Sequence, residues 1–249
     1  MRIRILATAI VISLVFFKCT THKGPPPEPV APTAKGFNYY LTKGNLLLKE
    51  KDFENAVVQL KQAISLNPSS SKAHNLLGIA YFQHKDYRPA EGEFKKAVDL
   101  DPSYAKAYNN LGGAYFMQRK FGEAEPMYKK ALSLSSELIS ANYSLGTLLI
   151  VLGQIEESSL YISKGIELDP NFLERNDAFI TNFSSLTFSS PEIYFIYAKV
   201  YASKGNVDKT VEYLQKAKKA GFKDWDRIMK EKDFEKVRKD PKILDFLPH

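Results

Sequence analysis

Few residues of this chain have the types and spacing that catalysis or metal binding requires. The four histidines are not grouped with cysteine or carboxylate at the spacing of metal ligands, and a single cysteine excludes a zinc site made of thiolates. Residues 142–146 read NYSLG, without the first glycine of a nucleophile elbow, and neither a phosphate loop nor a dinucleotide fingerprint occurs. We therefore expect no enzymatic activity, metal, cofactor or small-molecule substrate.

The one cysteine, Cys19, ends a segment that is typical of an export signal. Arg2 and Arg4 precede the apolar run 5–17, whose 13 residues suit a signal peptide at 1–18. A membrane-spanning helix would need about 20 apolar residues. The position of Cys19 resembles the acylated cysteine of bacterial lipoproteins, with Lys18 in place of the usual small residue. Two interpretations stay open: a lipid anchor on Cys19, and an incidental cysteine after an ordinary signal.

Residues 19–36 differ from the rest of the chain because they are rich in proline and poor in apolar side chains. Five prolines between residues 25 and 32 favour an extended backbone and a semi-stiff tether, and a ligand for another domain is the alternative. The net charge is +7, but the lysines recur at one place of the predicted second helices and are not interleaved with exposed aromatics. We therefore expect no nucleic acid partner.

A period of 34 residues organises most of the chain. The dipeptide Leu-Gly stands at residues 77–78, 111–112 and 145–146, three places that are 34 residues apart. A fixed period of this length is typical of a solenoid of stacked helix pairs. No run alternates apolar and polar residues as a strand would, so the predicted class is all-α.

This pattern resembles the tetratricopeptide repeat family. The family's small, apolar and helix-stopping places are filled in five copies, which start at Phe37, Ser71, Ala105, Ile139 and Pro191. The resemblance implies a right-handed superhelical solenoid of five helix-turn-helix repeats with a helical C-terminal cap. The implied boundaries are 37–70, 71–104, 105–138, 139–172 and 191–222 for the repeats, 173–190 for an insert and 223–249 for the cap.

The residue types indicate how the helix pairs begin and pack. Asp52 and Asp86 are expected to cap second helices by accepting hydrogen bonds from free amides. Gly78 is expected to meet Ala90, because two helices approach closely only where side chains are small. Pro126 lies beyond the first helical turn, so we expect a kink or a frayed start in its helix.

Two segments depart from the period. An Asn-Asp pair at 176–177 could cap a short helix in the 173–190 insert, which is interpreted as a spacer or as a partner contact. After residue 222, three short amphipathic pieces are expected to cover the open end of the stack. In the first of these, Trp225, Ile228 and Met229 share one face.

The resemblance also implies where a partner binds. In this family the first helix of each pair lines a groove, and ten residues are predicted to contact a protein or peptide there. They are Asn45, Asn75, Ile79, Phe82, Asn109, Phe116, Met117, Tyr143, Ile150 and Phe195. Asparagines can bond a peptide backbone and apolar side chains can form a trough, although inter-repeat core is the alternative for each. Leu41, Leu76 and Asn110 replace the residues of a basic clamp that binds acidic tails in some members, so we expect a less acidic ligand.

These patterns together predict a non-enzymatic adaptor or scaffold of the bacterial cell envelope. We expect it to be exported and membrane-anchored through its N-terminus, facing the periplasm or the cell surface. The alternative is a structural repeat protein that self-associates into a homo-oligomer and takes no extended peptide.

Overall fold

Helices form the regular structure of residues 35–172 and 191–247, which are the residues that the computed structural model describes, and no strand occurs among them. The helices are α1 (Phe37–Lys49), α2 (Phe53–Leu66), α3 (Ser71–Gln83), α4 (Tyr87–Leu100), α5 (Ala105–Met117), α6 (Phe121–Leu134), α7 (Ile139–Val151), α8 (Ile155–Leu168), α11 (Pro191–Ser203), α12 (Val207–Lys219), α13 (Arg227–Lys230), the 3-10 helix η1 (Lys232–Phe234) and α14 (Pro241–Leu244). The predicted signal peptide, Cys19, the tether up to residue 34, and the insert with its possible cap at 176–177 lie outside these residues.

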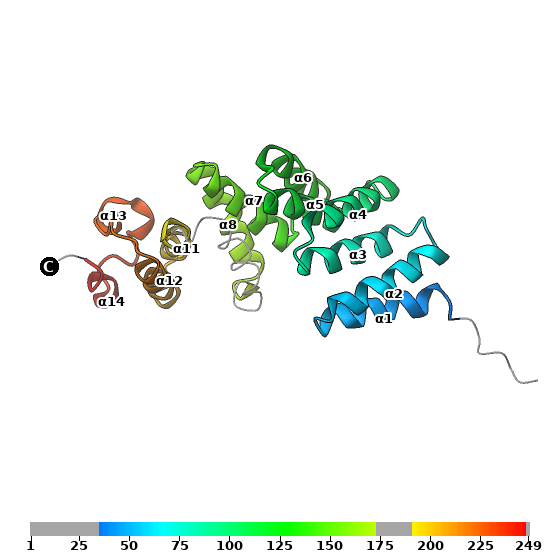
Figure 1. Cartoon of the computed structure of the whole chain (residues 1–249). Coiled ribbons are helices and arrows are strands. Elements are labelled where there is room, and N and C mark those ends of the chain that lie inside the picture. The colour runs from blue at the N-terminus through cyan, green and yellow to red at the C-terminus, as the bar shows by residue number, and fades with distance from the viewer. Residues whose placement is uncertain (1–34, 173–190, 248–249) are drawn as a thin grey trace, which may run out of the picture. The chain divides into compact units, whose positions relative to one another are not determined.

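The described helices follow one another as pairs (Figure 1). Within each pair a first helix packs on a second: α1 on α2, α3 on α4, α5 on α6, α7 on α8 and α11 on α12. From α2 to α7, each second helix also packs on the next first helix, and α8 packs on α11. The first four pairs begin 34 residues apart, at Phe37, Ser71, Ala105 and Ile139. The predicted all-α stack of helix pairs is confirmed.

The turn inside each pair has the same backbone conformation. One residue per turn has a positive φ: Lys51 (62°), Lys85 (68°), Arg119 (61°), Gly153 (77°) and Gly205 (74°). The amide that follows donates to the carbonyl five residues back, as Asp52 does to Leu47 at 2.9 Å. The left-handed conformation of this one residue, at the end of a right-handed helix, favours glycine. Lysine or arginine at that position lowers the stability by about 1 kcal/mol.

Glycines on the first helices let the two helices of a pair approach closely. A Cβ on Gly78 would lie 2.5 Å from Phe94 Cε1, and one on Gly112 would lie 2.7 Å from the Tyr128 ring. The three atoms nearest to a Cβ on Gly78 all belong to Phe94, while the expected approach to Ala90 stays a prediction. A ring on the second helix fills the space that the missing side chain leaves.

The two predicted aspartate caps differ in outcome. Asp52 Oδ1 accepts from the amide of Asn55 at 3.3 Å, as expected. Asp86 makes no such bond, because its Oδ2 lies 3.0 Å from His84 Nδ1 instead. The expectation for Asp86 was wrong because a nearby imidazole competes for its carboxylate.

Pro126 does not fray the start of its helix. Helix α6 begins at Phe121, which is 34 residues after the start of α4, and it continues through Pro126 to Leu134. Tyr128 and Ala131, which follow the proline, are fully buried. Their packing against neighbouring helices offsets an interior-proline cost of about 3 kcal/mol.

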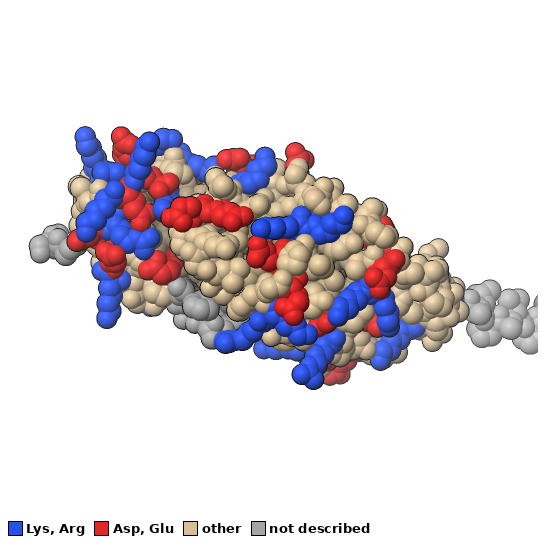
Figure 2. All heavy atoms as spheres, turned by 90° about the horizontal axis from the view of Figure 1, so that it is seen from above, with Lys and Arg blue, Asp and Glu red and all other residues tan. Residues whose placement is uncertain are grey.

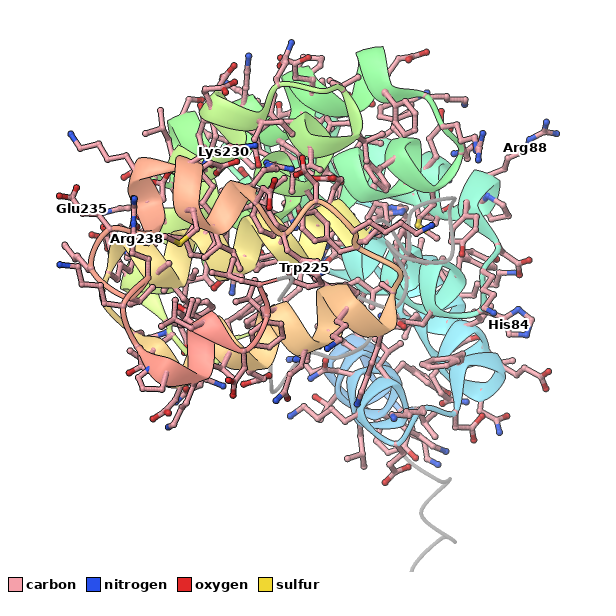
Figure 3. The ribbon with its side chains drawn as sticks, turned by 90° about the vertical axis from the view of Figure 1, so that its left-hand side faces the viewer. His84, Arg88, Trp225, Lys230, Glu235 and Arg238 are labelled. Carbon is pink, nitrogen blue, oxygen red and sulfur yellow. The ribbon has the colours of Figure 1, made fainter. Side chains whose placement is uncertain are left out.

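The C-terminal segment covers the last helix pair, as predicted. Ile228, Phe234 and Ile243 are fully buried and belong to the core formed with α11 and α12. Figure 3 looks onto this segment, where Trp225, Lys230, Glu235 and Arg238 are labelled. Met229 is 45% exposed, so it does not share the buried face of Ile228 that the sequence indicated. The first piece is a single short turn, α13, and cannot present both side chains to the core.

Candidate partner-binding face

All ten predicted contact residues lie on first helices, but their exposure divides them into two groups. Six are buried: Asn75, Phe116, Met117, Tyr143, Ile150 and Phe195. Four are half-buried: Asn45, Ile79, Phe82 and Asn109. The accessible residues belong to α1, α3 and α5. We define the open face by Leu41, Asn45, Leu48, Lys72, Ile79, Phe82, Lys106 and Asn109.

Asn75 joins two repeats. Its Oδ1 accepts from Asn110 Nδ2 at 2.9 Å, and its Nδ2 donates to the Tyr104 hydroxyl at 3.4 Å. Only 4% of Asn75 is exposed. Because both ends of the amide are used between α3 and α5, Asn75 holds the repeats together and is not free to bond a peptide.

Asn109 is better placed than Asn75 to form a hydrogen bond with a ligand. Its Nδ2 donates weakly to Ser140 Oγ at 3.5 Å, while its Oδ1 has no hydrogen-bond partner among the described residues. An unsatisfied buried acceptor costs about 1–3 kcal/mol. A backbone amide of a bound segment could satisfy this oxygen after a small rotation of the side chain.

Aromatic residues of the middle repeats pack between helices. Tyr143 is fully buried; its ring stacks on Phe172 at 5.1 Å and lies 6.3 Å from Tyr197 on α11. Burial raises the pKa of the Tyr143 hydroxyl well above its usual range. Phe116 is buried in a core cluster that also contains Leu145 and Leu148 of α7, in the next repeat. Both residues have the inter-repeat core role that was the alternative to partner contact.

The C-terminal segment covers the first helix of the fifth pair. The Phe195 ring stacks on Phe222 at 4.3 Å and lies 5.5 Å from Phe234, so it is fully buried. Lys199 Nζ, one turn further along α11, lies 2.9 Å from Glu231 Oε2. Burial alone would lower the pKa of Lys199, but its ion pair with Glu231 raises it. A partner cannot reach Phe195 while this segment is in place.

The remaining ionisable groups are structural or solvated. His74 Nδ1 lies 2.6 Å from Glu93 Oε2 and His74 Nε2 lies 3.0 Å from the Pro68 carbonyl oxygen, so both ring nitrogens are occupied. His84 and Arg88 point away from the ribbon in Figure 3. No group of three or more His, Cys, Asp or Glu that could hold a metal occurs in the described ranges. No described helix has the length and apolar character to cross a membrane.

Charge is distributed unequally between first and second helices. Helices α1, α3, α5 and α7 contain no Asp or Glu and four lysines, whereas α2, α4, α6 and α8 contain nine carboxylates and seven Lys or Arg side chains. Figure 2 shows both signs interspersed on the face seen from above, in keeping with ion pairs such as Lys95–Glu91. The expectation of a less acidic ligand did not use this asymmetry. Counting charges separately for each helix of the repeat would have found it.

Comparisons with known proteins agree with this architecture. Family models described as the tetratricopeptide repeat match residues 71–104, 105–138, 139–172 and 191–220, and one described as a TPR repeat matches residues 44–85. No curated protein sequence matches the chain.

Several solved structures share the fold. The MamA crystal structure is 25% identical, with 71% of this chain and 93% of that chain covered and a TM-score of 0.50. Pseudomonas aeruginosa pilF is 19% identical, with 81% and 96% covered and a TM-score of 0.53. TTC0263 of Thermus thermophilus, described as a thermophilic TPR protein, is 19% identical, with 78% and 96% covered and a TM-score of 0.54.

Proposed function

Because the chain belongs to the tetratricopeptide repeat family, we propose that it is a non-enzymatic adaptor that holds a protein or peptide partner on its open face. Repeats of this family are typically protein-interaction modules without catalysis, so the chain is a protein-interaction scaffold. The observation that carries the finer proposal is the incomplete burial of Ile79 and Phe82 on α3, on the same side of the helix as the exposed Lys72.

The chemistry of the open face suits a polypeptide. Leu41 and Leu48 on α1 continue the half-buried apolar surface of Ile79 and Phe82, and a partner that covers these side chains removes them from water. Asn45 supplies an amide that can both donate to and accept from a peptide backbone. The face combines apolar contact with a few oriented polar groups, as extended or helical segments require.

Co-purification from native cells tests this proposal. The full-length tagged chain is compared with the double variant Asn45→Ala/Ile79→Ser, and with a control variant, Val58→Ser/Leu160→Ser, at exposed apolar positions on second helices. Val58 is 58% and Leu160 70% exposed, so the control changes apolar surface without touching the open face. We expect the open-face variant to lose a specific protein that the control retains, with the helical circular dichroism of all three unchanged. Equal capture by both variants contradicts the proposal.

Self-association is the second candidate, and one observation favours it. Tyr39 and Leu46 on α1 are 40% and 52% exposed, and no repeat precedes α1 among the described residues to cover them. Solenoids usually protect such an end with a polar cap. Sedimentation at increasing concentration, with Leu46→Lys as the comparison, would show a dimer that the variant abolishes. A monomer at all concentrations rules this candidate out.

We also propose that the chain works in the cell envelope. The support is the basic and apolar segment before Cys19 and the proline-rich residues after it, which suit an anchor and a tether. Membrane fractionation compares the wild type with Cys19→Ala. Release of the variant from the membrane supports a lipid anchor; retention in the membrane identifies a protein anchor instead, and recovery of the wild type in the cytosol contradicts the envelope placement.

A further inference from the structure

We propose that the partner segment on the open face is acidic, with carboxylates that pair with Lys72 and Lys106 and apolar side chains that pack on Ile79 and Phe82. This inference rests on the proposed function and specifies the chemistry of the partner. The segment is an internal stretch and needs no free C-terminal carboxylate, unlike the acidic tails that a basic clamp binds.

The first helices of the first three repeats carry only positive charge. The 13-residue helices α1, α3 and α5 carry lysines and no carboxylate, so a positive field faces any segment that lies along them. The second helices of the same repeats carry six carboxylates and six Lys or Arg side chains, so their charges balance. Charge complementarity therefore selects an anionic partner for the first helices and disfavours a basic one.

The two lysines of the open face are accessible to a partner. Lys72 and Lys106 are exposed, and neither has an ion pair or hydrogen bond from its side chain among the described residues. Lysines elsewhere contrast with them: Lys95 Nζ lies 2.6 Å from Glu91, and Lys129 Nζ lies 2.6 Å from Glu125. Lys72 and Lys106 are thus available cations, as are the exposed Lys130 and Lys164 on second helices, which makes those two a matched comparison.

Lys72 and Lys106 occupy the same position in two neighbouring first helices. Each is the second residue of its helix, in α3 and in α5, and these helices are neighbours joined by the bond between Asn75 and Asn110. Packed helices lie about 8–10 Å apart. A segment in the polyproline II conformation has three residues per turn and advances about 3.1 Å per residue, so carboxylates three residues apart lie on one side and would reach both ammonium groups.

The missing clamp residues decide against a terminal tail. Leu41, Leu76 and Asn110 stand where a clamp has lysine, asparagine and arginine. Leu41 is half-buried and apolar, and Asn110 is already bonded to Asn75, so neither can hold a terminal carboxylate. Side-chain carboxylates of an internal segment can still reach Lys72 and Lys106 at the edge of the open face.

Fluorescence anisotropy with the full-length chain tests the inference. The probe is a fluorescein-labelled, C-terminally amidated peptide in which aspartates are separated by Leu-Phe pairs, and the control peptide has asparagine in place of each aspartate. The variant is Lys72→Glu/Lys106→Glu. The matched control is Lys130→Glu/Lys164→Glu, two exposed lysines on α6 and α8 that give the same change in net charge.

We expect the aspartate peptide to bind the wild type more tightly than the asparagine peptide. Lys72→Glu/Lys106→Glu should weaken its binding on the order of tenfold, and the matched control by less than about twofold. Equal weakening by the two variants overturns the inference, because the attraction is then unspecific. Equal affinity for the two peptides overturns the acidic preference and leaves the proposed function intact. Failure of both peptides to bind also overturns the inference, and co-purification then judges the proposed function by itself.

Discussion

Replacing Glu91 by glutamine should weaken the joint between the second and third repeats at neutral pH and have little effect in acid. Glu91 Oε1 lies 2.6 Å from Lys95 Nζ, and its Oε2 lies 2.8 Å from both Lys120 Nζ and Gln118 Nε2. Lys120 and Gln118 belong to the turn after α5, so this carboxylate links α4 to the next repeat. Burial alone would raise the pKa of Glu91, but its bonds to Lys120, Lys95 and Gln118 lower it from 4.5 to about 2.

The size of the effect follows from that pKa. The difference between 4.5 and about 2 corresponds to about 3 kcal/mol of unfolding free energy. The Lys95 and Lys120 side chains are 49% and 40% exposed, so water screens part of this interaction. We therefore expect Glu91→Gln to lower the unfolding free energy by about 1–2 kcal/mol at pH 7.

The sign of the pH dependence is fixed by the lowered pKa. The contribution of Glu91 is complete above pH 4.5 and is lost as the pH falls toward about 2, where the folded-state carboxylate takes up its proton. Urea unfolding followed by circular dichroism should show a gap between wild type and Glu91→Gln at pH 7 that closes through this range. Glu235→Gln, at an exposed position of the C-terminal segment, is the control and should show no gap. A gap of equal size at both ends of the range, or none at pH 7, would refute the reasoning.

Three further substitutions test the packing of the repeats. Gly78→Ala should destabilise the chain by about 1–3 kcal/mol, because the new Cβ would lie 2.5 Å from the Phe94 ring. Gly92→Ala should instead stabilise it by about 0.5–1 kcal/mol, because a Cβ at that helical position would have no atom within 4 Å. Thermal unfolding measures both, and a Gly78 variant as stable as wild type contradicts the packing. Asn75→Ala should cost about 1–3 kcal/mol in urea unfolding because Asn110 loses its buried partner at 2.9 Å; an unchanged midpoint would show that Asn75 is not structural.

The helices were predictable from the sequence because the 34-residue period repeats small, large and helix-ending residues at the same places. The starts of α3, α5 and α7 at Ser71, Ala105 and Ile139 are the starts read from that period. The frayed start expected at Pro126 does not occur, because the expectation weighed a local cost without the tertiary packing that offsets it. Positive φ at Lys85 could not be read from its residue type, since the turn geometry and not the side chain imposes it.

The candidate site was harder to predict because partner contacts and inter-repeat contacts use the same side of the first helix. The sequence places Asn75 and Asn109 at equivalent positions, yet Asn75 is bonded to the next repeat while the Asn109 carbonyl oxygen has no hydrogen-bond partner among the described residues. The difference depends on neighbours that periodicity does not reveal. Phe195 is buried for a similar reason, because the cap segment that covers it lies far along the chain.

Photo-crosslinking from single positions of the full-length chain in its native cells tests most directly whether a partner lies on the open face. A photoreactive residue is introduced at Ile79 or Asn109 on that face, and at the more exposed Val58 or Leu160 on second helices. We predict that one protein is captured from positions 79 and 109 and is absent from positions 58 and 160. Capture of the same protein from positions 58 and 160, with none from 79 and 109, would show that the first helices do not hold the partner.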